Sequence, residues 1–123
     1  MTIPTTTETA LDLDALSRAI AASDFDAVGA LLTDDVEWIE VDERTRPATP
    51  AVLRGRDAVV ATLREAHARE IVTVVDDAFA AGDRAALRLV CRYASGGEVV
   101  CNALVDVRDG RIARFSGVQA WDE

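Results

Sequence analysis

The spacing of apolar residues follows a helical period in the first half of the chain. Three stretches show it: residues 9–22, a stretch after the N-cap candidate Asp24, and a stretch that opens at Arg56 and ends near Arg69. Their apolar positions are Leu13, Leu16 and Ile20, then Phe25, Val28, Leu31 and Leu32, then Val60, Leu63 and His67. The pattern therefore predicts three helices.

Alternation with a period of two marks the strands. Residues 36–42 predict a strand between the second and third helices, and residues 43–52, with two prolines, predict a loop. Four further strands are predicted at 71–80, 84–94, 98–107 and 111–120, separated by the turn dipeptides Gly82-Asp83, Gly96-Gly97 and Asp109-Gly110. Helices that precede an antiparallel meander predict an α+β fold.

Length and charge narrow the class of protein. The chain has 123 residues, and we expect a flexible leader over residues 1–8 and a single domain over residues 9–123. The net charge is −9, and the basic residues are arginines only. Because a nucleic-acid-binding protein needs a basic face, this charge argues against a nucleic-acid partner. The charge is uneven: residues 1–43 carry a net −10 and residues 44–69 a net +4, so the two stretches could dock or could be solvated faces of opposite sign.

Neither a membrane span nor a metal site is indicated. No apolar run reaches the length of a spanning helix, and the N-terminal residues lack the features of a signal peptide, so we expect a cytoplasmic protein. Cys91 and Cys101 lie in apolar strands and predict buried thiols rather than a disulfide framework. No metal-ligand spacing occurs, and we expect no cofactor.

Four stretches resemble the nuclear transport factor two-like superfamily, and within it the SnoaL-like polyketide cyclase and ketosteroid isomerase group. They are SDFDAVGALLTDDVEW (23–38), LRGRDAVVATL (53–63), AAGDRAALRLVCRY (80–93) and VDVRDGRIARF (105–115). The resemblance implies a cone-shaped α+β barrel, in which a curved antiparallel sheet is closed by the three helices around a deep apolar pocket. It also implies homodimers that pair through the outer face of the sheet.

Glu40 is the leading candidate for a catalytic residue. The resemblance to ketosteroid isomerases places it where that family carries its carboxylate base. It shares a strand face with Trp38, because residues two apart project the same way. An apolar pocket would desolvate the carboxylate and raise its pKa, which suits removal of a proton next to a carbonyl group. The alternative is a solvated side chain at the pocket rim.

Strand alternation supplies the pocket walls. Tyr93 and Cys91 share one face, and Phe115 and Gln119 share a face of the last strand. If the two hairpin loops are equal in length, both sets lie on one side of the sheet. The loop length then decides which side chains of the strand between them face the same side. Two-residue loops add Asn102 and Asp106 to this face, whereas three-residue loops add Cys101, Ala103 and Val105. We favour the second set because it is apolar.

The remaining candidates have assigned roles. Tyr93 is a second catalytic candidate that would donate a hydrogen bond to a developing oxyanion, as the family chemistry requires. Gln119 would orient a polar group of the substrate. His67, the only histidine, is a candidate substrate-binding residue or general base, and the alternative is a capping or rim residue near the helix end. Trp38, Cys91, Ala103 and Phe115 would line the pocket. Superfamily epoxide hydrolases carry an aspartate on the final strand where this chain has Gly117, so an epoxide-opening site is not expected.

These residues favour an enzyme without a cofactor, an isomerase or cyclase that moves a proton on a small, apolar, carbonyl-bearing metabolite. The alternative is a non-catalytic ligand-binding or dimerisation module of the same fold, and a third possibility is a lipid or pigment carrier. We expect a homodimer in each case, because alternation leaves apolar residues such as Val90 and Val118 on the outer face of the sheet.

Overall fold

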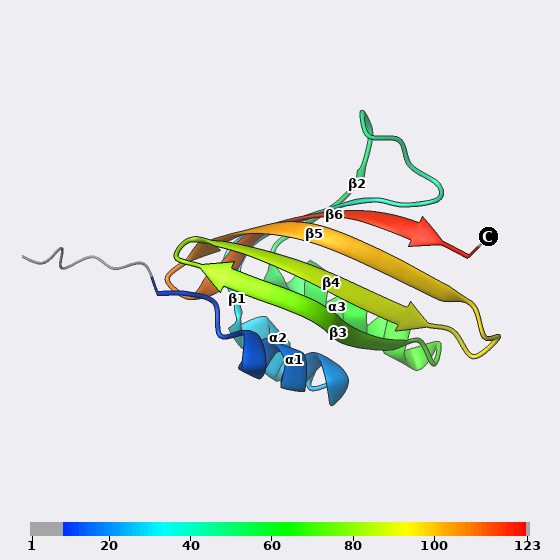
Figure 1. Cartoon of the computed structure of the whole chain (residues 1–123), viewed down its shortest axis with the longest axis horizontal. Coiled ribbons are helices and arrows are strands. Elements are labelled where there is room, and N and C mark those ends of the chain that lie inside the picture. The colour runs from blue at the N-terminus through cyan, green and yellow to red at the C-terminus, as the bar shows by residue number, and fades with distance from the viewer. Residues whose placement is uncertain (1–8, 123) are drawn as a thin grey trace, which may run out of the picture.

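A computed structural model describes residues 9–122, so the predicted leader over residues 1–8 lies outside the described residues. Within this range the helices are α1 (Leu13–Ala21), α2 (Phe25–Ala30) and α3 (Arg56–Ala68). The strands are β1 (Leu32–Val41), β2 (Ala51–Arg54), β3 (Val72–Ala81), β4 (Arg84–Arg92), β5 (Glu98–Arg108) and β6 (Arg111–Trp121). The strands form one curved sheet in the order β2-β1-β6-β5-β4-β3 (Figure 1). The α+β class is as predicted.

The sheet differs from the predicted antiparallel meander in two respects. First, β1 pairs with β6 in parallel, so the sheet is mixed. Second, the stretch 43–52 was predicted as a loop, but its last two residues belong to the edge strand β2, which pairs with β1. This strand is short and mostly exposed, and therefore lacks the alternation that marks a half-buried strand.

The boundary between α2 and β1 was also predicted too late. Leu31 and Leu32 were placed on the apolar face of the second helix, but α2 ends at Ala30 and β1 begins at Leu32, four residues before the predicted start at Val36. Leu32 is fully buried within the strand. Its burial explains the error, because a buried leucine at this position suits a helix face and a strand equally well.

The register of the last three strands depends on two turns and one bulge. Tyr93 and Gly97 close a three-residue turn between β4 and β5, with Gly96 at φ +97°. Asp109 and Gly110 form a two-residue turn between β5 and β6, but the register then shifts by one residue, which leaves Ala113 as a β-bulge. The two turns are therefore unequal, unlike either predicted pair of two-residue or three-residue loops. The bulge shifts the register of β6 by one residue, as a third residue in the second loop would.

This register decides which side chains of β5 face the interior. Cys101 pairs with Leu89 on one side and with Gln119 on the other, so the three side chains share one face of the sheet. Cys101, Ala103 and Val105 are buried on that face, whereas Asn102 is exposed. The inner face of β5 is thus the apolar one that was predicted for three-residue loops.

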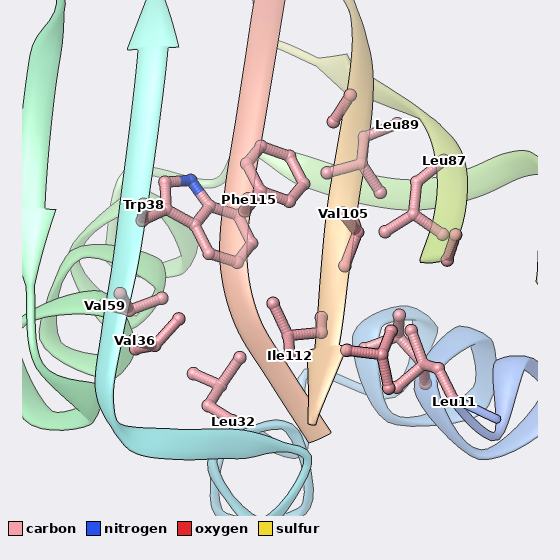
Figure 2. Close-up of a cluster of buried hydrophobic side chains, with 14 of the residues drawn as sticks. Leu11, Leu32, Val36, Trp38, Val59, Leu87, Leu89, Val105, Ile112 and Phe115 are labelled. Atoms are coloured by element: carbon pink, nitrogen blue, oxygen red, sulfur yellow. The ribbon is translucent and has the colours of Figure 1, made fainter. Parts of the chain in front are cut away.

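The interior of the curved sheet holds the core. Trp38 stacks on Phe115, with ring centroids 3.7 Å apart and planes within 3° of parallel. Leu32, Val36, Val105 and Ile112 pack around this pair in the close-up of Figure 2. Full burial of such side chains stabilises the fold by roughly 1.5–3 kcal/mol each. The sheet is curved but not closed, and an enclosed pocket remains a prediction.

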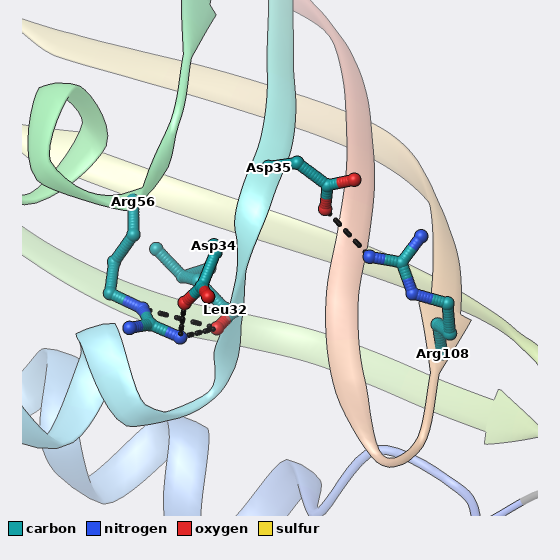
Figure 3. A network of polar contacts seen from close by, with 5 residues as sticks. All are labelled: Leu32, Asp34, Asp35, Arg56 and Arg108. Carbon is teal, nitrogen blue, oxygen red and sulfur yellow. Dashed lines mark hydrogen bonds and ion pairs between the residues drawn. The ribbon is translucent and has the colours of Figure 1, made fainter.

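Charged contacts attach α3 to the start of β1. The Arg56 guanidinium donates to the Asp34 carboxylate at 2.7 Å and to the Leu32 carbonyl oxygen at 2.9 Å (Figure 3). Arg108 donates to Asp35 at 2.6 Å and lowers the pKa of that carboxyl. The pairs of Arg56 with Asp34 and of Arg64 with Asp26 join the basic stretch to the acidic stretch, whereas Arg108 belongs to β5. Helix α3 lies against β1 and β2, and α1 lies against β3.

Candidate functional site

Four side chains form a continuous chain of hydrogen bonds on the inner face of β1 and β6. The Trp38 indole Nε1 donates to Oε1 of Glu40 at 2.5 Å. The Gln119 amide Nε2 donates to the other carboxylate oxygen, Oε2. Oε1 of Gln119 in turn accepts a hydrogen bond from Nε1 of Trp121 at 2.8 Å. We call these four residues the Glu40 cluster.

The parallel pairing of β1 with β6 creates this cluster. Trp38 lies opposite Phe115 and Glu40 lies opposite Gly117, and Gln119 follows Gly117 on the same face. Gly117 has no room for a side chain: a Cβ there would lie 2.7 Å from Sγ of Cys101. The glycine therefore leaves the space over it to the side chains of Cys101 and Phe115.

Glu40 lies in an environment that disfavours its charged form. The side chain is half-buried, and burial is the main reason that its pKa is raised above the usual value. The hydrogen bonds from Trp38 and Gln119 oppose this effect, while the charge of Asp42 adds to it. Both donors are neutral, so no cation within the cluster holds the carboxylate ionised. Burial together with neutral hydrogen-bond donors therefore favours the protonated form of Glu40 more than water does.

Two thiols lie close to the carboxylate. Burial raises the pKa of Cys101 to about 12, and the nearby Glu40 adds to the shift. The pKa of Cys91 is raised for the same two reasons, although a contact with the Thr73 hydroxyl at 3.4 Å opposes them. Both cysteines are therefore protonated and act as small apolar side chains beside Glu40.

A groove opens next to the cluster. It has a volume of about 230 Å³ and is lined by Asp42, Glu43, Arg44, Arg69, Tyr93 and Trp121. We call it the mouth groove. The Tyr93 and Trp121 rings form one wall, with centroids 5.9 Å apart. Trp121 belongs to both the groove and the Glu40 cluster, whereas Glu40 itself does not line the groove.

The structure brings together most of the candidates from the sequence. Trp38, Glu40 and Gln119 are in direct contact. The candidate walls Cys91, Ala103 and Phe115 lie on the same inner face, where Ala103 and Phe115 are packed in the core. Tyr93 lines the mouth groove, and burial raises the pKa of its hydroxyl.

His67 is placed differently from the other candidates. Its side chain is exposed, and its ring packs edge-on against Phe25 with centroids 5.7 Å apart, which places it at the contact between α2 and α3. Of the predicted face of α3, Val60 and Leu63 are partly buried against the core, but the residue that the helix buries fully is Val59, so the inward face is turned away from His67. The structure thus gives His67 an aromatic neighbour and does not join it to the Glu40 cluster.

Trp121 was missed as a functional candidate. Its position two residues after Gln119 puts both side chains on one face of β6, and this alternation is the signal that could have identified it. Within residues 9–122, His, Cys, Asp and Glu side chains form no group of three that could hold a metal ion. None of the helices in the described range combines the length and apolarity that crossing a membrane requires.

Comparison with solved structures shows what the fold is similar to. A putative ketosteroid isomerase from Kribbella flavida is 20% identical, with a TM-score of 0.70 over 90% of this chain and 75% of that one. An NTF2-like protein of unknown function from Mesorhizobium loti is 25% identical, with a TM-score of 0.70 over 88% and 87% of the two chains. An LEH-like epoxide hydrolase from M. tuberculosis is 20% identical, with a TM-score of 0.65 over 88% and 79% of the two chains.

The sequence matches a protein-family model but no curated protein at a significant level. The model of the SnoaL-like domain, however, matches residues 13–115, a range that runs from the first helix to Phe115 and includes Glu40. This match covers most of the chain and agrees with the NTF2-like fold of the solved structures. The chain belongs to the SnoaL-like domain family.

Proposed function

We propose that the protein is a cofactor-independent isomerase or cyclase, in which Glu40 moves a proton on a small, apolar, carbonyl-bearing metabolite. The observation that carries this proposal is the environment of Glu40. A half-buried carboxylate with a raised pKa is held by neutral N–H donors beside an open groove. The similarity in fold to a putative ketosteroid isomerase supports the same class of reaction.

The proposed step balances without a further reactant. Glu40 takes a proton from the carbon next to the carbonyl group, and the electron pair of the broken C–H bond forms a C=C bond. The carbonyl oxygen then carries the negative charge. In an isomerisation the protonated Glu40 returns its proton to another carbon of the substrate. In an aldol-type cyclisation the enolate carbon attacks a second carbonyl carbon, whose π electron pair moves to its oxygen, and this alkoxide takes the proton back from Glu40. Such general-base catalysis contributes about 10²–10⁴-fold to the rate.

The other candidates would have supporting roles. Tyr93 would donate its hydroxyl proton in a hydrogen bond to the developing oxyanion, since it lines the groove and its raised pKa keeps it protonated. Trp38, Cys91, Ala103 and Phe115 lie on the same face as Glu40 and would contact the apolar body of the substrate.

The test is the substitution Glu40→Gln, assayed against carbonyl compounds that the wild-type protein converts. The amide is similar in size but cannot accept the proton, so binding should persist while kcat falls by at least about a hundredfold. Glu37→Gln is the matched control. Glu37 lies on the same strand but pairs with Arg54 and Arg114 on the opposite face, so this variant should retain its activity. Turnover that survives Glu40→Gln would refute the proposal.

A second candidate function is a homodimeric binding module without catalysis. The observation that favours it is the outer face of the sheet, where Phe79, Leu104 and Val118 are each more than 60% exposed. They line a groove of about 380 Å³ across the strands from β3 to β6. Exposed apolar surface of this kind is typical of an interface. Sedimentation should show a dimer that Leu104→Asp converts to a monomer, and a wild-type monomer would refute this pairing.

A further inference from the structure

The hydrogen-bonding groups on either side of Gln119 allow only one orientation of its side-chain amide. The indole N–H of Trp121 can donate a hydrogen bond but cannot accept one. It therefore requires the oxygen of the Gln119 amide, which it meets at 2.8 Å. The amide NH₂ group must then point away from Trp121, toward the Glu40 carboxylate, which accepts its hydrogen bond.

We propose that Trp121 is a positioning residue for Glu40, which acts by fixing the Gln119 amide with its NH₂ group toward the carboxylate. The effect of Trp121 on catalysis rests on the function proposed above for Glu40. The effect of Trp121 on the Gln119 amide does not, because it concerns only the hydrogen bonds among the three side chains. Trp121 itself does not contact the carboxylate: Trp38 and Gln119 donate the two hydrogen bonds that Glu40 accepts.

Turning the Gln119 amide over would cost both of its hydrogen bonds. A flipped Gln119 would place its oxygen against Oε2 of Glu40 and its NH₂ group against the N–H of Trp121. The first contact opposes two acceptors and the second opposes two donors, so both hydrogen bonds would be lost. Only a protonated Glu40 could donate to the flipped amide oxygen, and the clash with Trp121 would remain. Trp121 therefore favours the orientation that matches an ionised Glu40.

Removing the indole N–H should release this constraint. With phenylalanine at position 121, the amide can flip and accept a hydrogen bond from a protonated Glu40. The protonated form becomes more favourable, and the pKa of Glu40 rises further. The other titratable groups near the carboxylate are Asp42, Cys91 and Cys101. Both thiols stay neutral near pH 7, and Asp42 is unchanged in every variant, so these groups do not account for the shift.

A double-mutant cycle on the carboxyl titration of Glu40 tests the inference. The NMR signal of the Glu40 carboxyl carbon is followed against pH in the wild type, Trp121→Phe, Gln119→Leu and the double variant. We expect Trp121→Phe to shift the titration upward, and Gln119→Leu to do the same. In the Gln119→Leu background, Trp121→Phe should then shift nothing more, because the relay is already absent.

Two results would overturn the inference. One is an unchanged titration in Trp121→Phe. The other is an equal shift with and without Gln119, which would mean that the indole acts through burial. Replacement of Trp121 by benzothienylalanine, which keeps the bicyclic shape but lacks the N–H, controls for packing and should reproduce the upward shift. The readout does not depend on turnover, so it can succeed even if Glu40→Gln proves fully active.

Discussion

Among the glycines, Gly117 has the least room for a side chain, and an alanine there should destabilise the fold. A Cβ at this position would lie 2.7 Å from Sγ of Cys101 and 2.9 Å from Cε1 of Phe115. Neither neighbour can move freely. Cys101 is buried, and the ring of Phe115 is fully buried and stacked on Trp38. Any displacement of Phe115 would therefore reach the indole that donates to Glu40.

The magnitude follows from two opposing effects. Replacing glycine by alanine within a strand usually stabilises a protein by roughly 0.5–1 kcal/mol, because the unfolded chain loses conformational freedom. Overpacking of a well-filled core costs about 1–3 kcal/mol. Since both contacts are shorter than real Cβ atoms tolerate, the second effect should prevail. We expect Gly117→Ala to lower the free energy of unfolding by roughly 0.5–2 kcal/mol.

Urea unfolding followed by tryptophan fluorescence measures this change. Gly97→Ala is the matched control, because the nearest heavy atom to its added Cβ is Oγ of Ser95 at 3.9 Å. It should change the stability by no more than about 0.5 kcal/mol. In the Gly117→Ala background, Cys101→Ala removes one of the two clashes and should recover about 0.5 kcal/mol or more relative to its effect alone. A Gly117→Ala variant as stable as the wild type would refute the reasoning.

Two further predictions concern the groups around the site. Because the pKa of folded Glu40 is raised, the native state binds more protons than the unfolded chain between the usual carboxyl pKa and the raised value. The stability of the wild type relative to Glu40→Gln should therefore fall as pH rises through this window in urea titrations, and an increase would contradict the raised pKa. Cys101, with a pKa of about 12, and Cys91 should react with Ellman's reagent at pH 8 at least about tenfold more slowly in the native protein than in urea. Rapid labelling of the native protein would mean that the thiols are not buried.

The elements of the fold could be predicted where local periodicity decides them. The four last strands were expected within two residues of their observed ends. In β4, β5 and β6 buried residues largely alternate with more exposed ones, and β3, which has no buried residue, is bounded by the turn at Gly82-Asp83. The parallel pairing of β1 with β6 was not predicted. It joins residues as far apart in sequence as Glu40 and Gln119, separated by 79 positions, and no local pattern encodes such a pair.

The candidate site divides in the same way. Alternation was sufficient to put Trp38 beside Glu40, and Phe115 beside Gln119 on the last strand. The prediction for His67 used helical spacing alone. That spacing gives a face to the helix but not its rotation, which depends on the burial of Val59 against the sheet. Trp121 was missed because a donor-only indole matters only once its acceptor, the Gln119 amide, is known to be fixed by a third residue.

The β-bulge at Ala113 determines which side chains of β6 face Glu40. With the three-residue turn between β4 and β5 and the two-residue turn between β5 and β6, an unbulged β6 would pair Cys101 with Val118. Phe115 and Gln119 would then lie on the outer face, because a shift of one residue exchanges the two faces of a strand. The bulge restores the pairing of Cys101 with Gln119 and so returns the amide to Glu40. The face predicted from equal loops is therefore observed, although the cause is a single inserted residue beyond the last turn.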